Sequence, residues 1–216
     1  MLLTPPSEIL NRKLRFHPIR IITYLIILGI SSAFFTLDVS YFVTTAGTVY
    51  NQFKFPQIFH ANTILILASS YTVLQMKNAK LRDDFVAYKN ALLVTSLLGI
   101  AFTSFQLLGW KELRANGIHF TNNISGTYLY LISGLHILHL LVGIGLLLWF
   151  LAKALLIEKD AYQTLLFDTD PIEKLKVEML ATYWHFVDIV WIFLYLTFLL
   201  TMNFVPDNWR GILNPF

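Results

Sequence analysis

Five long apolar segments, separated by charged stretches, dominate the pattern of this chain. They cover approximately residues 19–38, 57–76, 90–110, 127–151 and 180–203. A helix needs about 20 apolar residues to cross the roughly 30 Å of bilayer hydrocarbon. Each segment is therefore long enough for one crossing. The pattern predicts an all-α membrane protein with five transmembrane helices, which form a single membrane domain over residues 1–216.

The composition agrees with this prediction. Apolar residues make up 56% of the chain and charged residues 13%, and the mean hydropathy is +0.61. Soluble domains carry about 25% charged residues, so a disordered chain, a nucleic-acid-binding domain and an ordinary soluble enzyme are excluded. The net charge of +3 is too small to indicate a polyanionic partner. Because there is no cysteine, disulfides, thiolate zinc sites and iron–sulfur clusters are excluded as well.

Positive charges are distributed unevenly between the two sides of the predicted bundle. Twelve of the 16 Lys and Arg residues lie before or at the start of the first segment, between the second and third, or between the fourth and fifth. Because cytoplasmic loops carry an excess of Lys and Arg, the N-terminus is predicted to be cytoplasmic and the C-terminus outside. Basic residues at these cytoplasmic ends are expected to meet phospholipid head groups. They are Arg12, Lys13, Arg20, Lys77 and Lys80.

Asp188 is the only formal charge well inside a predicted span, and His185 precedes it by three residues on the same helix face. A carboxyl in the membrane is costly and needs a partner in the protein. One interpretation is a proton relay or ligand site. The other is a buried hydrogen-bonded pair that holds the fifth helix in register, and we predict this structural role.

Two histidines, His136 and His139, lie on one face of the fourth segment, and Gly143 follows one turn later. Gly143 is expected to let a neighbouring helix approach closely. Haem ligation by two histidines needs ligands at similar depth on facing helices. No two intramembrane histidines on different segments match in depth, so we expect no haem. Asp188 lies closer to the level of His139 and is a candidate to bond it across the helices.

Uncharged polar residues follow helical spacing on the second and third segments. They are Asn62, Ser69 and Ser70 on one and Thr95, Gly99, Thr103 and Gln106 on the other. Such residues allow membrane helices to pack closely and to share hydrogen bonds. We interpret them as packing residues, with a channel lining as the alternative. The sequence contains no phosphate-binding loop, nucleophile–base motif or useful metal-ligand spacing.

Residues 178–199, EMLATYWHFVDIVWIFLYLTFL, resemble the last helix of subunit III of haem–copper cytochrome c oxidases. Residues 62–72, 105–110 and 125–143 resemble earlier helices of the same family, and the resemblance extends to the first segment, residues 28–35, so it covers all five segments. It is closest to the five-span form, whose first helix begins in the cytoplasm. The motif residues are His136, His139, Glu178, Trp184, His185, Asp188 and Trp191.

The resemblance implies a non-catalytic subunit in the bacterial inner membrane, a multi-pass protein of an aerobic respiratory chain. It implies no catalytic, cofactor or metal site in this chain, because the family's haems and copper lie in subunits I and II. Subunit I is the expected main contact, beside subunit II, other oxidase subunits and a supercomplex with a quinol:cytochrome c oxidoreductase. The family also holds phospholipid in a cleft between helix bundles, and we expect this groove to lie between the first two spans and the last three. The family supports assembly, stability and proton uptake during oxygen reduction and proton translocation.

The sequence departs from the family pattern in two places. The family often has a glutamate after a serine in the first helix, but residues 28–35, LGISSAFF, contain no acid. Gly109, not an acid, precedes Trp110.

An accessory subunit of a nitric oxide reductase or of a quinol oxidase has the same fold and is an alternative. A small transporter or channel and a b-type cytochrome anchor are alternatives from other classes.

Overall fold

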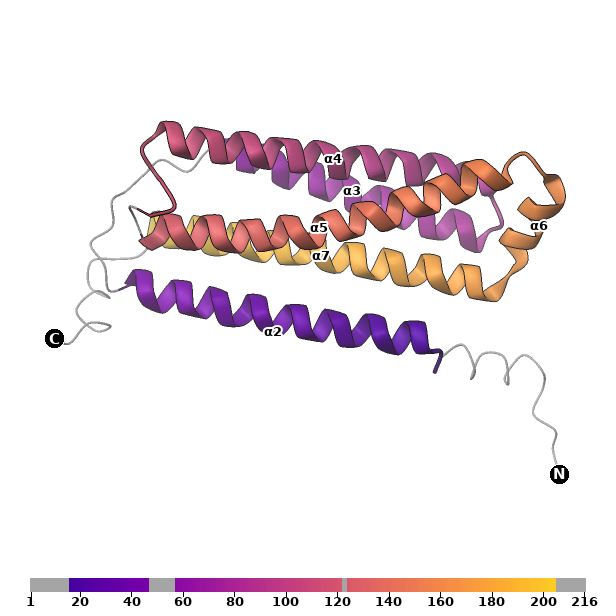
Figure 1. Cartoon of the computed structure of the whole chain (residues 1–216), viewed down its shortest axis with the longest axis horizontal. Helices are drawn as coiled ribbons and strands as arrows, with labels where there is room; N and C mark the ends of the chain where they lie inside the picture. Colours follow the sequence, from indigo (N-terminus) through magenta and orange to yellow (C-terminus); the bar gives the residue numbers. More distant parts are fainter. Residues whose placement is uncertain (1–15, 47–56, 122–123, 205–216) are drawn as a thin grey trace, which may run out of the picture.

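The computed structural model describes residues 16–46, 57–121 and 124–204, which fold into six helices with no strand among them (Figure 1). The helices are α2 (Pro18–Ala46), α3 (Ile58–Leu81), α4 (Phe85–Ala115), α5 (Ile124–Ile157), α6 (Ala161–Thr169) and α7 (Pro171–Phe204). The five predicted apolar segments correspond to α2, α3, α4, α5 and α7. The short helix α6 lies in the polar stretch between the fourth and fifth segments.

Local sequence explains the sharp connections at the end of the molecule that carries α6. Between α3 and α4, Asp83 adopts a left-handed backbone conformation with φ 59°, which Asp tolerates better than most residues. The Asp84 side chain then caps α4 by accepting a hydrogen bond of 3.0 Å from the Ala87 amide. Asp160 caps α6 in the same way, and Pro171 opens α7 at a position that proline favours.

The helices confirm an all-helical membrane protein, but they differ from the predicted spans in length and character. In the described parts, four helices are long and apolar enough to cross a membrane: α2, α4, α5 and α7. The exception, α3, carries polar residues through its second half, including Gln75, Lys77, Asn78 and Lys80. The helical ends also extend beyond the hydrocarbon length, since α5 and α7 each contain 34 residues.

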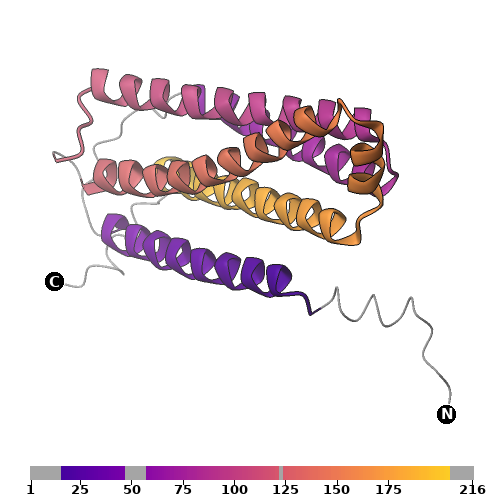
Figure 2. The ribbon, with the colours of Figure 1, turned by 45° about the vertical axis from the view of Figure 1, so that its right-hand side comes forward.

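The helices form two unequal parts. Helices α3, α4, α5 and α7 pack together, with α3 alongside α4 and α7. Helix α2 lies to one side and packs against α5 and α7 (Figures 1 and 2). Many large apolar side chains remain exposed around the outside, for example Leu67, Leu97 and Ile189. In water such a surface is unfavourable, so it fits a lipid environment.

Trp184 of α7 occupies the centre of the four packed helices and is 1% exposed. A Cβ atom on Gly99 of α4 would lie 2.8 Å from its ring, and one on Gly143 of α5 would lie 3.1 Å from it. The indole Nε1 donates a hydrogen bond of 2.7 Å to the Ser69 hydroxyl of α3. The close approach expected at Gly143 is thus confirmed, and the partner is an aromatic ring of α7.

Candidate functional site

The polar residues of α3 and α4 contact each other across the helix interface. The Asn62 side chain donates to the Gln106 side-chain oxygen Oε1 at 3.0 Å, and the hydroxyls of Thr72 and Thr95 share a hydrogen bond of 2.8 Å. The Asn62–Gln106 contact lies near the start of α3, and the Thr72–Thr95 contact lies near the middle of α3. The geometry agrees with the packing interpretation of these residues.

His185 of α7 also contacts α3, but its partner differs from the expected one. Its Nδ1 lies 2.7 Å from the Ser70 hydroxyl. The Asp188 side chain is buried, and neither carboxyl oxygen makes a hydrogen bond of acceptable geometry with a described group, although Ser70 is close by. The predicted His185–Asp188 pair is therefore wrong, because His185 turns toward α3.

The proposed bond between Asp188 and His139 is wrong as well. The Nδ1 atom of His139 contacts the Leu135 carbonyl of its own helix at 2.8 Å, which is a local arrangement within α5. The His139 carbonyl accepts a hydrogen bond of 2.9 Å from the Tyr183 hydroxyl of α7. The link between α5 and α7 at this level therefore runs through Tyr183.

His136 lies inside an aromatic cage. It is fully buried, and its ring centroid lies 5.4 Å from that of Trp191, 5.8 Å from Phe102 and 6.4 Å from Phe34. Neither ring nitrogen has a hydrogen-bond partner among the described residues. Within that part of the chain, no group of three or more His, Cys, Asp or Glu side chains is placed to hold a metal ion.

Asp38 is a second buried carboxyl, which sequence reasoning placed at the end of the first span. Helix α2 continues to Ala46, so Asp38 lies inside it and is 6% exposed. It accepts a hydrogen bond of 3.0 Å from the Thr197 hydroxyl of α7. One turn later, the buried hydroxyls of Tyr41 and Thr201 lie 2.9 Å apart. The absence of any helix breaker after residue 38 was the signal that indicated a longer helix.

The predicted head-group residues have different environments. Arg12 and Lys13 lie outside the described residues. Arg20 of α2 binds Glu178 of α7 at 2.9 Å, with both side chains partly exposed. Lys77 is half-buried on α3. Thus Arg20 joins α2 to α7 near the start of both helices. A head-group contact of Arg20 stays a prediction, and it would involve the part of the guanidinium that does not bind Glu178.

Lys80 does not fit a lipid contact, because its side chain is only 1% exposed. Its ammonium donates to the Phe167 carbonyl at 2.7 Å and to Asp168 at 3.1 Å, and lies 3.3 Å from the centre of the Phe167 ring. Burial lowers the pKa of Lys80 to about 8, against the opposing effect of Asp168. Lys80 therefore fastens α6 to α3 instead of facing a head group.

A groove of about 590 Å³ runs between α2 on one side and α5 and α7 on the other. Its walls are mainly apolar, with Ile26 and Ile30 from α2 and Val142 and Leu146 from α5. Polar groups are few and include Thr23, His139 and Lys176. Arg20–Glu178 closes one end of the α2–α7 contact and Asp38–Thr197 the other. An acyl chain suits this shape and chemistry.

A family model described as cytochrome c oxidase subunit III matches residues 15–202. This chain belongs to that family. Similar proteins include cytochrome c oxidase subunit 3 of Rhipicephalus sanguineus, 34% identical over 148 residues, covering 68% of this chain and 51% of the relative. The subunit 3 of Polypterus ornatipinnis is 31% identical over 156 residues, which cover 71% and 52%. That of Spodoptera frugiperda is 29% identical over 153 residues, which cover 71% and 93%.

The chain spans about half the length of the first two of these curated relatives. The family motif residues lie mostly in the packed core of this subunit III fold. Trp184 and Asp188 are buried, and Trp191 is buried and donates to the Thr63 hydroxyl of α3 at 3.3 Å. Glu178 is partly exposed and binds α2. The motif thus positions helices against one another across much of α7.

Proposed function

We propose that this chain is the non-catalytic subunit III of a haem–copper terminal oxidase, a cytochrome c oxidase of an aerobic respiratory chain. The match of the family model over residues 15–202 carries this proposal. The geometry is compatible with it, because the motif side chains make packing contacts between helices. In this role the chain supports assembly, stability and proton uptake of the catalytic subunit, which oxidises cytochrome c, reduces oxygen and pumps protons.

The proposed topology has five spans with the N-terminus in the cytoplasm. Helix α3 is the least apolar of the five long helices that the structure describes. It nevertheless lies antiparallel to α4, and its polar side chains Asn62 and Thr72 bond to α4. Internal hydrogen bonds of this kind lower the cost of placing polar side chains in a bilayer. Twelve of the 16 basic residues fall on the proposed cytoplasmic side, as the positive-inside rule requires.

The proposed lipid site is the groove between α2, α5 and α7. The expected groove separated the first two spans from the last three, but α2 packs on α5 and α7 whereas α3 packs on α4 and α7. The apolar walls suit an acyl chain, and Lys176 and Arg20 lie at the end where a phosphate would sit. Bound phospholipid would then fill the space between α2 on one side and α5 and α7 on the other.

The proposed partners are subunit I as the main contact, subunit II and further oxidase subunits, which hold the haem and copper. A supercomplex with a quinol:cytochrome c oxidoreductase and a bacterial inner membrane are parts of the same proposal. The three relatives named above come from eukaryotes, so they support the family but not the bacterial location.

Purification of the native complex from the source membrane tests the assignment. Mass spectrometry of a complex captured through this chain should identify a haem–copper subunit I, with oxygen consumption driven by reduced cytochrome c. A large subunit of the nitric oxide reductase type, or electron transfer from quinol alone, would contradict the cytochrome c oxidase assignment. The separately purified chain should show no stoichiometric haem absorption band.

A reporter fusion tests the topology. Alkaline phosphatase fused after Phe216 should be active, because it would lie outside the cytoplasm. The same enzyme inserted at Asp83, in the turn between α3 and α4, should be inactive. Activity at Asp83 would show that the turn lies outside and would overturn this orientation or the crossing by α3.

A further inference from the structure

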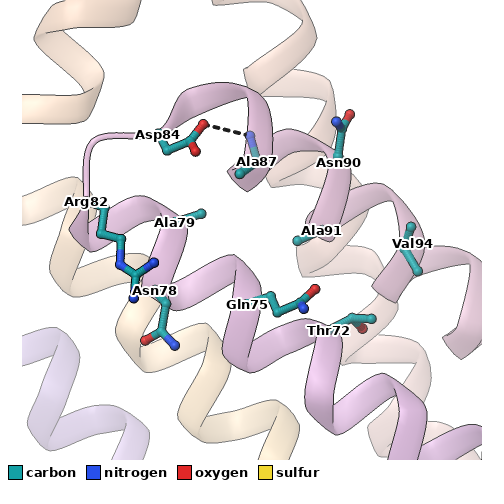
Figure 3. A pocket seen from close by; sticks show the side chains of 10 residues that line it. All are labelled: Thr72, Gln75, Asn78, Ala79, Arg82, Asp84, Ala87, Asn90, Ala91 and Val94. Carbon is teal, nitrogen blue, oxygen red and sulfur yellow. Dashed lines mark hydrogen bonds between the residues drawn. The ribbon is translucent and has the colours of Figure 1, made fainter.

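A second pocket, distinct from the groove beside α2, opens between α3 and α4 near their connecting turn. Its volume is about 500 Å³. Figure 3 shows Arg82 and Asp84 at the end next to the turn, and Thr72 and Val94 farther along the two helices. The carboxamides of Gln75 and Asn78 come from α3, and that of Asn90 comes from α4. None of these residues belongs to the family motif described above.

The pocket carries two opposite charges that do not neutralise each other. In the described parts of the chain, the Arg82 guanidinium forms no ion pair. Asp84 uses one carboxyl oxygen to cap α4 through the Ala87 amide, and the same set of ion pairs does not include it. A guanidinium and a carboxylate at one mouth match a ligand that carries an anion and a cation.

The long axis of the pocket runs from a polar mouth into an apolar environment. Ten residues separate Thr72 from Arg82, which corresponds to about 15 Å along a helix. Val94 lines the deeper part and is exposed. Tyr71 and Leu74, which precede the lining residues Thr72 and Gln75 in the sequence, are exposed as well. Since α4 is long and apolar enough to cross a membrane, the mouth lies at the level of lipid head groups and the deeper part at the level of acyl chains.

We propose that this pocket binds a glycerophospholipid whose head group combines a phosphodiester with a primary ammonium. Arg82 binds the phosphate by charge-assisted hydrogen bonds, and Asp84 accepts from the ammonium. The amides of Asn78 and Asn90 donate to phosphate or glycerol oxygens. The glycerol and first acyl carbons lie along Ala91 and Val94. The proposal concerns this chain alone and does not depend on its membership of an oxidase.

The test uses the full chain, purified in detergent, stripped of lipid and then titrated with defined lipids. Native mass spectrometry counts the lipids that remain bound. The wild-type chain should bind phosphatidylethanolamine more tightly than phosphatidylglycerol, which lacks the ammonium, and phosphatidylcholine, whose cation has no N–H donor. Glycerophosphoethanolamine, the head group without acyl chains, should not bind at the same concentrations.

Two variants separate the contributions of the two charges. Arg82→Gln should weaken binding of phosphatidylethanolamine by about tenfold, because a charge-assisted hydrogen bond is lost. Asp84→Asn keeps a good helix cap and should remove the preference for phosphatidylethanolamine over phosphatidylglycerol. Lys159→Gln is the matched control, since Lys159 is an exposed lysine at the same end of the bundle and its loss should change neither result.

Several outcomes would overturn the proposal. They are unchanged phosphatidylethanolamine binding in a folded Arg82→Gln chain, tighter binding of phosphatidylglycerol by the wild type, and binding of the soluble head group as tight as that of the lipid. If either variant loses its helical circular dichroism, Asn90→Leu provides a second probe that leaves the turn and the cap intact. It should weaken phosphatidylethanolamine binding by a smaller factor, and an unchanged affinity would contradict the assigned contact.

Discussion

Helix α2 packs differently from the four-helix unit formed by α3, α4, α5 and α7, although α2, α4, α5 and α7 are all apolar enough to cross a membrane. In the most apolar stretch of α2, 11% of residues are buried, against 39% in α4, 39% in α5 and 44% in α7. The four-helix unit has a continuous core around Trp184, whereas α2 borders a groove. Apolar character therefore brings a helix into the membrane, and small and polar residues decide how tightly it packs there.

The polar contacts of α2 with α7 lie near its start and in its second half. Arg20–Glu178 lies near its start, and Asp38–Thr197 and Tyr41–Thr201 lie in its second half. Between them, Thr23, Ile26 and Ile30 line the groove, and Phe34 packs on the ring of His139 of α5. A helix attached in this way leaves room for a ligand without loss of the main core. The difference between the two regions leads to four expectations, from the largest effect to the smallest.

The largest effect is expected at the centre of the four-helix unit. Trp184→Ala removes a fully buried ring and its hydrogen bond to Ser69 and should cost about 3–5 kcal/mol of unfolding free energy. The matched control is Trp149→Ala, because Trp149 of α5 is 54% exposed and its loss should cost little. Thermal unfolding of the detergent-purified chain measures both. Equal losses would show that Trp184 does not organise the core.

A smaller effect is expected for the attachment of α2. Asp38→Leu leaves the Thr197 hydroxyl without its acceptor and should weaken the α2–α7 contact by about 1–3 kcal/mol. The chain has no cysteine, so a cysteine pair replacing Tyr41 and Thr201 reports this contact by cross-linking with a short bifunctional thiol reagent, which spans the gap left by the phenol ring. The yield should fall with Asp38→Leu and remain unchanged with Val39→Ala, whose site is exposed. An unchanged yield in both would refute a docking role for Asp38.

A pH effect is expected at the turn end, where Lys80 fastens α6. The unfolded chain holds the Lys80 proton up to about its ordinary pKa of 10.5, whereas burial lowers the pKa of Lys80 in the folded chain to about 8. Between these values the unfolded chain binds more protons, so the contribution of Lys80 to the unfolding free energy rises with pH. Asp168 and Glu173 attract this ammonium and Lys174 opposes it.

Melting temperatures of the wild type and of Lys80→Met, measured from about pH 7 to about pH 10, isolate this contribution, because this range begins below the folded pKa of Lys80 and ends just below the unfolded one. The wild type should gain a few degrees relative to the variant above pH 8, since roughly 1 kcal/mol shifts a melting temperature by about 2–4 °C in chains of this size. Lys159→Met is the control, because Lys159 is exposed. A constant difference between wild type and Lys80→Met would show that Lys80 does not titrate in this window.

The sequence predicted the helices better than their contacts. Apolar runs located all five long helices, and the family motif identified the buried faces of α7. The side-chain pairs were mostly wrong, because residues three apart on a helix share a face but can turn toward different neighbours, as His185 does toward Ser70. Lys80 and Asp38 were misjudged for a related reason. Their partners, Asp168 and Thr197, are 88 and 159 residues away, and no local pattern indicates such pairs.

The smallest effect is expected at Asp188, although a buried carboxyl is usually sensitive. Neither of its oxygens has a hydrogen-bond partner of acceptable geometry among the described residues, so Asp188→Asn or Asp188→Leu removes no such bond within this part of the chain. The unfolding free energy of the purified chain should change by less than about 1 kcal/mol in both variants, because Asp188→Asn exchanges one buried polar group for another and Asp188→Leu removes the cost of burying one. Ser70→Ala is the comparison, since it breaks the contact with His185 and should cost about 1 kcal/mol.

If Asp188→Leu destabilises the purified chain more than Ser70→Ala does, Asp188 has a partner within the chain. If it leaves the purified chain stable but lowers retention of the subunit in the native complex, the partner of Asp188 lies on another subunit.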